Sequence, residues 1–331
     1  MRQEDKNFRE AFANTQVIDI LPERLQKILS GIPANVAQYV EEIRVREGRP
    51  LMIHGGGREY FVRQDGLPTS NQDEGYLVTR QDTSMLLQLL SNYSIYAVEE
   101  ELRNGYVTVK GGGRVGLAGR IVLEDGKIKT LKSINSFNIR IPREVTGVAD
   151  KVMPYITISN SVMNSIIFSP PQMGKTTLIR DIARQLSDGF SKFKGIKVSI
   201  VDERSEIAGC LNGVPQNKVG VRTDVLDACP KAAGIMMLIR SMSPEVIITD
   251  EIGRTEDVGA VLEAMNSGIK IITTAHSASV NEAQNRPILA GLLEEKVFER
   301  ILILGNSLGV GTLENVYDGR SLEKVLAKSL R

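Results

Sequence analysis

The second half of the chain contains five short runs of almost entirely apolar residues, each separated from the next by a segment with helical spacing. A strand that is apolar on both faces has to be covered on both faces, and helices between parallel strands provide that cover. The pattern therefore predicts an α/β fold in which a parallel sheet lies between two layers of helices. The predicted strands are residues 165–168, 197–202, 245–250, 270–275 and 300–304.

The first predicted strand leads into a sequence whose second half matches a phosphate-binding loop. Gly174, Lys175 and Thr176 fill the Gly-Lys-Ser/Thr positions, whereas Ser169 stands where the pattern has its first glycine. A strand, a tight loop and a helix in this order direct backbone N–H groups and the positive end of the helix at phosphates. Lys175 is expected to reach the β- and γ-phosphates, and the Thr176 hydroxyl to hold Mg²⁺.

The missing first glycine is interpreted as a variation of the loop and not as a loss of function. A serine can make this turn if its backbone keeps an ordinary conformation, and Pro170 and Pro171 then stiffen the loop. The alternative is a coincidental Gly-Lys-Thr at the start of a helix, which the apolar strand before the loop disfavours. The residues expected to bind the nucleotide are Ser169, Pro170, Pro171, Gln172, Met173, Gly174, Lys175, Thr176 and Thr177.

Acidic pairs stand at the ends of two further predicted strands. One pair is Asp202 and Glu203, and the other is Asp250 and Glu251. Ligands bind beyond the carboxyl ends of the strands in an open parallel sheet, so both pairs are predicted beside the phosphate loop. In the second pair, one carboxylate can hold Mg²⁺ and the other can polarise an attacking water. The alternative for that pair is a solvated cap on the next helix.

A third strand of this kind is followed by His276, one of only two histidines in the chain. A lone histidine is often structural, but beside two acidic pairs its imidazole is expected to sense or stabilise the γ-phosphate. His54 is the only other residue available for histidine-dependent chemistry.

The first half of the chain mixes helical and strand patterns and predicts an α+β domain at residues 1–145. A linker is expected at 146–156 and the nucleotide-binding domain at 157–331. With a formal net charge of +1, 5% aromatic residues and no tryptophan, the sequence lacks the signature of nucleic-acid binding. It also lacks a secretory signal and the apolar run of about 18 residues needed to cross a bilayer. A soluble, cytoplasmic protein is therefore predicted.

Four motifs, taken in order, resemble the secretion-ATPase branch (type II and type IV secretion) of the RecA-like phosphate-loop NTPases. They correspond to a Walker A loop, an acidic box, a Walker B strand and a histidine box, and read SPPQMGKTT, VDERSEIAG, MSPEVIITDEIG and GIKIITTAHS. From about residue 15 to residue 320, the chain also resembles a sporulation family of this branch. The run GVPQNKVGVRTDVLDACPKAAGIMMLIRSMSPEVIITDEIGR carries that closer resemblance.

The resemblance implies a cytoplasmic, hexameric ATPase of the mother cell that uses ATP and Mg²⁺. Its partners would be membrane proteins of a channel complex that leads to the forespore and recruits the ATPase to the membrane. Hydrolysis would energise that complex. The N-terminal domain would pack over the nucleotide, and no direct nucleic-acid partner is expected.

The same resemblance implies roles for individual residues. Glu251 takes the Walker B role and His276 the histidine-box role. Glu203 or Asp202 takes the acidic-box role, with Asp202 as a further Mg²⁺ contact. Whether Glu251 or Glu203 is the general base stays open. An arginine is expected to stabilise charge on the γ-phosphate, and Arg140 of the N-terminal domain is the preferred candidate. The other candidates are Arg114, Arg222, Arg240 and Arg254.

Two other functions are compatible with these residues. One is a nucleic-acid-dependent ATPase, since RecA-like cores also drive work on DNA and RNA, although the stacking aromatics that it needs are missing. The other is an ATP-binding scaffold, in which bound nucleotide stabilises an assembly and turnover is incidental. The bulky Gln172 and Met173 at the loop tip leave the scaffold open, because they are expected to slow turnover.

Overall fold

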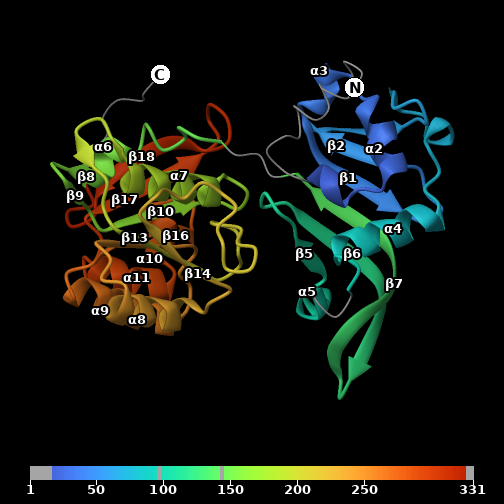
Figure 1. Ribbon diagram of the computed structural model, residues 1–331. Coiled ribbons are helices and arrows are strands. Elements are labelled where there is room, and N and C mark those ends of the chain that lie inside the picture. The colour runs from blue at the N-terminus through green and yellow to red at the C-terminus, as the bar shows by residue number, and fades with distance from the viewer. Residues whose placement is uncertain (1–16, 95–97, 142–144, 326–331) are drawn as a thin grey trace. The chain divides into compact units, whose positions relative to one another are not determined.

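The computed structural model describes residues 17–94, 98–141 and 145–325, which are drawn in colour in Figure 1. The chain divides into two compact units, Met1–Arg143 and Glu144–Arg331. Each unit has a hydrophobic core of its own and is described by itself. None of the helices in the described ranges is both long and apolar enough to cross a lipid bilayer.

The first unit is an α+β structure built on one seven-stranded antiparallel sheet with the order β4-β3-β2-β1-β7-β6-β5. Its strands are β1 Val40–Arg46, β2 Met52–Gly55, β3 Arg58–Val62, β4 Pro68–Thr69, β5 Tyr106–Thr108, β6 Arg114–Glu124 and β7 Lys127–Arg140. Its helices are η1 Val17–Ile20, α2 Glu23–Ser30, α3 Ala34–Ala37, η2 Gln72–Glu74, α4 Arg80–Leu90 and α5 Glu99–Asn104. Apolar residues from both sets form one core.

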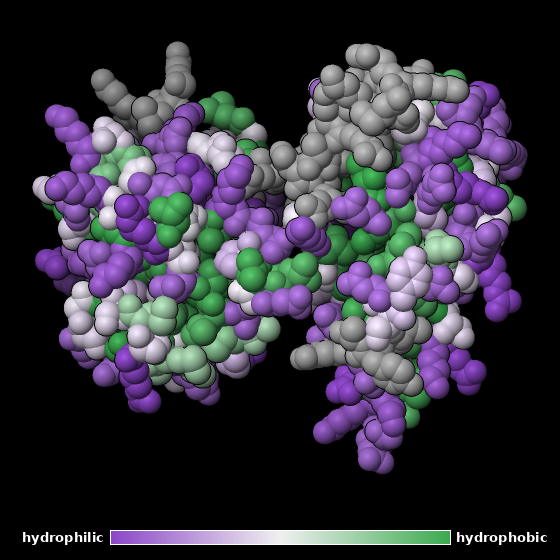
Figure 2. Space-filling view, viewed as in Figure 1, coloured by the Kyte–Doolittle hydropathy of each residue, from purple (hydrophilic) through white to green (hydrophobic). Residues whose placement is uncertain are grey.

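Strands β6 and β7 form a long hairpin that turns at Asp125 and Gly126. Both turn residues have positive φ, 52° and 74°, which an Asp-Gly pair adopts readily. Figure 2 shows hydrophilic side chains gathered at the outer end of this hairpin, where most of residues 118–124 are exposed. The core of the unit reaches only to Leu117 and Leu131, so the hairpin extends beyond it.

The second unit is built on a seven-stranded sheet with the order β14-β13-β15-β16-β10-β17-β18. All its neighbouring strands are parallel except β17 and β18. The five strands expected from the apolar runs are present, and the two edge strands β14 and β18, which are rich in polar residues, were not predicted. The strands are β10 Ser165–Ser169, β13 Val198–Asp202, β14 Thr223–Asp227, β15 Val246–Thr249, β16 Lys270–His276, β17 Arg300–Gly305 and β18 Thr312–Asp318.

Helices cover both faces of this sheet, and successive residues of β10 identify the two layers. Ile167 belongs to a core that includes residues of α7, whereas Ile166 and Phe168 belong to a second core that includes residues of α8 and α9. This arrangement confirms the predicted sandwich of helices around a mainly parallel sheet. The helices are α6 Met153–Ile156, α7 Lys175–Asp188, α8 Lys231–Ser241, α9 Thr255–Asn266, α10 Val280–Gln284 and α11 Pro287–Glu294. Short strand pairs are β8 Thr157–Ile158 with β9 Ser161–Val162, and β11 Gly189–Phe190 with β12 Phe193–Lys194.

The segment expected as a linker, residues 146–156, packs into the second unit. Its apolar side chains at 149, 152, 153 and 156 follow helical spacing and are buried in that unit's core. The amide of Ala149 donates to Oδ2 of Asp181 on α7 at 2.9 Å, and Gln185 of α7 donates to Oδ1 of Asp150 at 2.7 Å. The division between the units therefore lies earlier, between Arg143 and Glu144.

Candidate nucleotide-binding site

The predicted phosphate loop connects β10 directly to α7, which begins at Lys175. The chain turns at Gln172 and Gly174, whose φ values are 61° and 75°. Ser169 has no positive φ and is fully buried as the last residue of β10, and its hydroxyl donates to the carbonyl of Pro170 at 2.7 Å. The backbone therefore does not require glycine at Ser169, which is the condition under which the sequence variant was expected to be tolerated.

The remaining loop residues form the first turn of α7 and the exposed rim in front of it. Thr176 and Thr177 are half-buried in that turn, and Pro171 and Gln172 are exposed. The N-terminus of α7 carries unpaired backbone N–H groups and the positive end of the helix dipole. The loop and helix therefore have the arrangement that binds phosphate.

Lys175 is held by its own loop and by His276. Its Nζ donates to the carbonyls of Ser169 at 3.2 Å and Pro170 at 3.1 Å, and lies 2.8 Å from Nδ1 of His276. Burial lowers the pKa of Lys175, although the nearby Glu251 carboxylate acts in the opposite direction. The nearest partners of this ammonium are thus neutral oxygens and an imidazole.

His276 connects this lysine to one of the predicted acids. It ends β16 and lies beside Ser169 in the parallel register of β10 and β16. Its Nε2 is 3.1 Å from Oε1 of Glu251, which follows β15. About two-thirds of each of these two side chains is buried, with 33% of His276 and 35% of Glu251 exposed. The structure therefore joins Lys175, His276 and Glu251 in one chain of polar contacts, as expected from strands that end at one edge.

Asp202 has a different environment from the one predicted. It is fully buried at the end of β13, and its two carboxylate oxygens accept hydrogen bonds from the amides of Glu206, Ile207 and Ala208 at 2.8 to 2.9 Å. Burial raises the pKa of Asp202, although the backbone hydrogen bonds act against this. The geometry supports a role in holding the following loop instead of the predicted Mg²⁺ contact.

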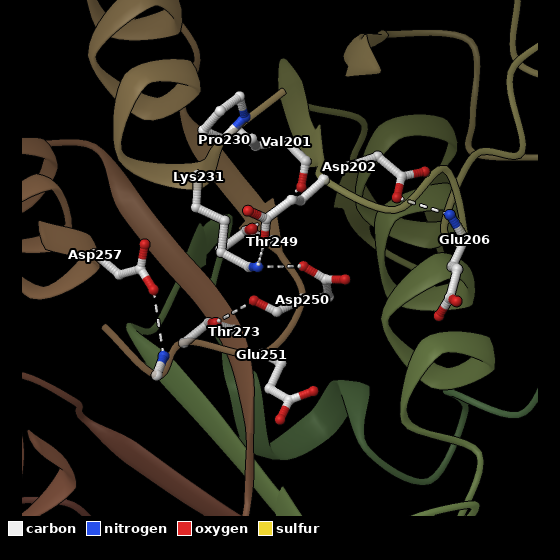
Figure 3. A network of polar contacts seen from close by, with 12 residues as sticks. Val201, Asp202, Glu206, Pro230, Lys231, Thr249, Asp250, Glu251, Asp257 and Thr273 are labelled. Atoms are coloured by element: carbon white, nitrogen blue, oxygen red, sulfur yellow. Dashed lines mark hydrogen bonds and ion pairs between the residues drawn. The ribbon is translucent and has the colours of Figure 1, made fainter. Parts of the chain in front are cut away.

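Glu203 and Asp250 share a lysine that the sequence did not identify as functional. The Nζ of Lys231 contacts Oε2 of Glu203 and lies 3.2 Å from Oδ1 of Asp250. Figure 3 shows Lys231 reaching from the start of α8 toward Asp250. A cation at the first residue of a helix faces the positive end of the helix dipole, and this was the available signal that Lys231 needs acidic partners.

Lys231, Glu203 and Asp250 shift one another's pKa values. Burial would lower the pKa of Lys231, but the two carboxylates outweigh burial and raise it. The hydrogen bond from Lys231 lowers the pKa of Glu203, to which Nη1 of Arg254 at 3.9 Å also contributes. Burial raises the pKa of Asp250 in spite of the lysine.

The predicted Mg²⁺ would depend largely on oxygens that the nucleotide supplies. Among the described residues, no group of three or more His, Cys, Asp or Glu side chains is arranged to hold a metal ion by itself. Oδ1 of Asp250 is buried, its 3.2 Å contact with Lys231 is an ion pair without hydrogen-bond geometry, and the Thr176 hydroxyl stands in the first turn of α7. These two oxygens fit Mg²⁺, which usually takes one or two protein oxygens together with phosphates and water.

The candidate arginines differ in what they contact. Arg140 ends β7 in the first unit, where its side chain is 66% exposed and its Nε lies 3.6 Å from Glu42. Arg114 stacks over the ring of Tyr106 in the same unit. In the second unit, Arg222 donates to the carbonyl of Ser187 at 2.8 Å and so has a structural partner. Arg254, in contrast, lies 3.9 Å from the carboxylate of Glu203.

Comparison with known proteins identifies the family. The description "Sporulation stage III, protein AA" belongs to the family that matches residues 12–324. The chain belongs to this family. It is similar to Stage III sporulation protein AA of Bacillus subtilis (strain 168), with 48% identity over 303 residues that cover 92% of this chain and 94% of the relative. The family match extends over both units.

Solved structures with a similar fold are secretion ATPases. The Legionella pneumophila ATPase DotB matches with a TM-score of 0.50 and 17% identity, covering 80% of this chain and 72% of DotB. The pilus retraction motor PilT, solved with bound ADP, matches with a TM-score of 0.50 and 18% identity, covering 80% of this chain and 74% of PilT. At these identities the likeness establishes the RecA-like fold of secretion ATPases for this sporulation family.

Proposed function

We propose that this chain is a motor-type ATPase that binds and hydrolyses ATP with Mg²⁺. The observation that carries the proposal is the contact chain from Lys175 through His276 to Glu251 beside the N-terminus of α7. It joins a cation suited to phosphates, an imidazole and a carboxylate at the edge of the sheet where ligands bind. The ADP bound to PilT, a protein of the same fold, supports a nucleotide as the ligand.

In this mechanism Lys175 leaves the loop carbonyls and binds the β- and γ-phosphates. The backbone N–H groups of residues 172–177 would bind the phosphates, and the hydroxyl of Thr176 and the carboxylate of Asp250 would hold Mg²⁺. The metal supplies neutralisation of charge that develops on the phosphates. Transfer to water then needs a base that orients the attacking molecule and stabilisation of the γ-phosphate charge.

We assign the base role to Glu251 rather than Glu203. Glu203 accepts from Lys231 and lies near Arg254, so its negative charge is already engaged by two cations. Glu251 instead contacts the imidazole of His276 at 3.1 Å. His276 therefore links the attacking side of the reaction to the lysine on the phosphates. Arg140 stays the proposed source of further positive charge.

The biological role proposed with this activity follows from the family. The ATPase would act as a cytoplasmic hexamer in the mother cell and energise a channel complex that leads to the forespore. Membrane proteins of that complex would recruit it. An ATP-dependent scaffold with little turnover is the competing function, because Lys175 is bonded to its own loop and has to be released before it can act.

Steady-state ATP hydrolysis by the purified chain tests the proposal, with Lys175→Ala and Glu251→Gln as comparison variants and oligomer size recorded for each. We expect turnover by the unchanged protein, ATP binding weakened about a hundredfold by Lys175→Ala, and binding without turnover by Glu251→Gln. If the unchanged protein binds ATP but hydrolyses it no faster than Glu251→Gln, the scaffold function replaces the motor.

A further inference from the structure

We propose that Lys231 is a positioning residue that serves as a built-in cation between Glu203 and Asp250 and fixes both carboxylates beside the phosphate loop. The inference rests on the proposed ATPase function and extends it to a residue outside the four motifs. Lys231 would act on the reaction through these two carboxylates and not by touching the nucleotide.

The first support is the burial of the lysine and its contacts. Only 6% of its side chain is exposed, and its Nζ contacts Glu203 and lies 3.2 Å from Asp250. These partners follow two neighbouring strands, β13 and β15, while the lysine begins α8. One ammonium therefore joins three separate elements at the carboxyl edge of the sheet.

The second support is the cost of this position for the helix. A lysine at the first residue of α8 is unfavourable to the helix dipole, and a buried charge is unfavourable unless it is paired. Both unfavourable terms are offset only if the two carboxylates contact the ammonium of Lys231. Residues that are unfavourable for their own helix, and are nevertheless fully paired at a site, are typical of functional sites.

The third support is the close packing of α8 against β13. A Cβ on Gly234 of α8 would lie 2.6 Å from Cγ1 of Val201, so the helix can approach β13 this closely only with glycine there. The Thr249 hydroxyl of β15 donates to the carbonyl of Val201 at 3.1 Å. The lysine and its two carboxylates thus stand on three closely packed elements, α8, β13 and β15.

The consequence for catalysis concerns charge as well as position. Glu203 and Asp250 would repel each other without a cation between them, and a free divalent ion could bridge them in the absence of nucleotide. The ammonium occupies that place. Asp250 then presents its oxygen at one fixed point, and Glu203 stays out of competition with Glu251 for the attacking water.

The first experiment compares Lys231→Ala with the unchanged protein at a temperature where both are folded. We expect kcat to fall at least about tenfold while the Kd for a fluorescent ATP analogue changes less than about threefold. Propylammonium, which completes the missing side chain, should restore part of kcat, and an equal concentration of tetramethylammonium should not. Equal kcat, or loss of ATP binding together with kcat, would overturn the proposal.

The matched control is Lys270→Ala. Lys270 is ion-paired with Glu299 at 2.9 Å and stands at the opposite end of β16 from His276. Its removal should lower stability without a change in kcat, and propylammonium should have no effect on the variant. If Lys270→Ala behaves like Lys231→Ala, the loss of kcat reports only a weakened fold.

A second experiment keeps the proposal testable if the unchanged protein does not hydrolyse ATP. We expect Lys231→Met to lower the folding equilibrium constant at least about tenfold in the natural background, because two buried carboxylates lose their cation. The same change should cost less than about threefold once Glu203→Gln and Asp250→Asn have removed both charges. Equal losses of folding equilibrium constant in the two backgrounds would refute the role of Lys231 as a cation between the two carboxylates. Absence of turnover alone would refute only the motor function.

Discussion

Two lysines at one edge of one sheet have opposite surroundings. Lys175 contacts backbone carbonyls and an imidazole, and burial lowers its pKa. Lys231 contacts two carboxylates, which raise its pKa in spite of burial. The protein neutralises the charge of Lys231 internally, while the charge of Lys175 stays largely uncompensated. The residue type alone thus does not decide the role, because only Lys175 has charge left for a phosphate.

The largest expected difference between the two lysines is in nucleotide affinity. Lys175→Met should weaken ATP binding about a hundredfold, since it removes charged hydrogen bonds to the phosphates. Lys231→Met should change the affinity less than about threefold, because its charge already belongs to Glu203 and Asp250. Titration of both variants with a fluorescent ATP analogue measures this, and equal losses would abolish the distinction.

Removal of His276 should separate turnover from binding on the Lys175 side. His276→Gln breaks the link between Lys175 and Glu251, and we expect kcat to fall between about tenfold and a hundredfold with little change in affinity. His54→Gln is the matched control, because His54 is the other histidine and lies near Glu41 in the first unit. A turnover assay in which both variants fall equally would contradict the assignment.

The two lysines should also respond differently to alkaline pH. The pKa of Lys175 is lowered from 10.5, so Lys175 loses its proton at a lower pH than an ordinary lysine, and ATP affinity should already begin to fall below pH 10.5. The pKa of Lys231 is raised above 10.5, so its contribution to stability is complete below 10.5 and is lost only as pH rises further. Affinity and unfolding measured over this range should therefore diverge, whereas a parallel decline of both would contradict the two assignments.

The smallest effect should appear at the two cysteines, which report on local packing. Cys210 is buried, and this burial raises its pKa to about 12. Cys229 is half-buried and lies two residues before Lys231. Cys229 should react faster with a thiol reagent. Lys231→Met should raise the Cys229 rate about threefold by loosening the start of α8, and Lys175→Met should not, as mass spectrometry of labelled protein can determine.

Much of this edge could be predicted from sequence because its elements are local. An apolar strand followed by Gly174 and Lys175 predicts a phosphate loop from one stretch of sequence, and strands that end in acids or histidine are expected to meet at one edge of a parallel sheet. The strand β14 escaped prediction because three of its five residues are polar and it lies at the sheet edge. The apolar residues at 149–156 follow helical spacing. This spacing was overlooked because the pattern of elements changes there, which led to the interpretation of the segment as a linker.

Lys231 could not be predicted in the same way, because its partners depend on the order of the strands. Glu203 and Asp250 are neighbours because β13 lies next to β15 in the sheet, and Lys231 at the start of α8 contacts both. Likewise, Asp202 has the residue type of a metal ligand, but three amides of its own loop occupy it. Sequence patterns identified which residues are chemically capable, and tertiary contacts determined which of them are already engaged.

The two hydrogen bonds that join Ala149 and Asp150 to α7 have a mechanical consequence. Helix α7, which begins at the end of the candidate phosphate loop, is bonded at Asp181 and Gln185 to the stretch of backbone at the start of the second unit. A displacement of the backbone at residues 149 and 150 would therefore be transmitted to α7 through these two contacts.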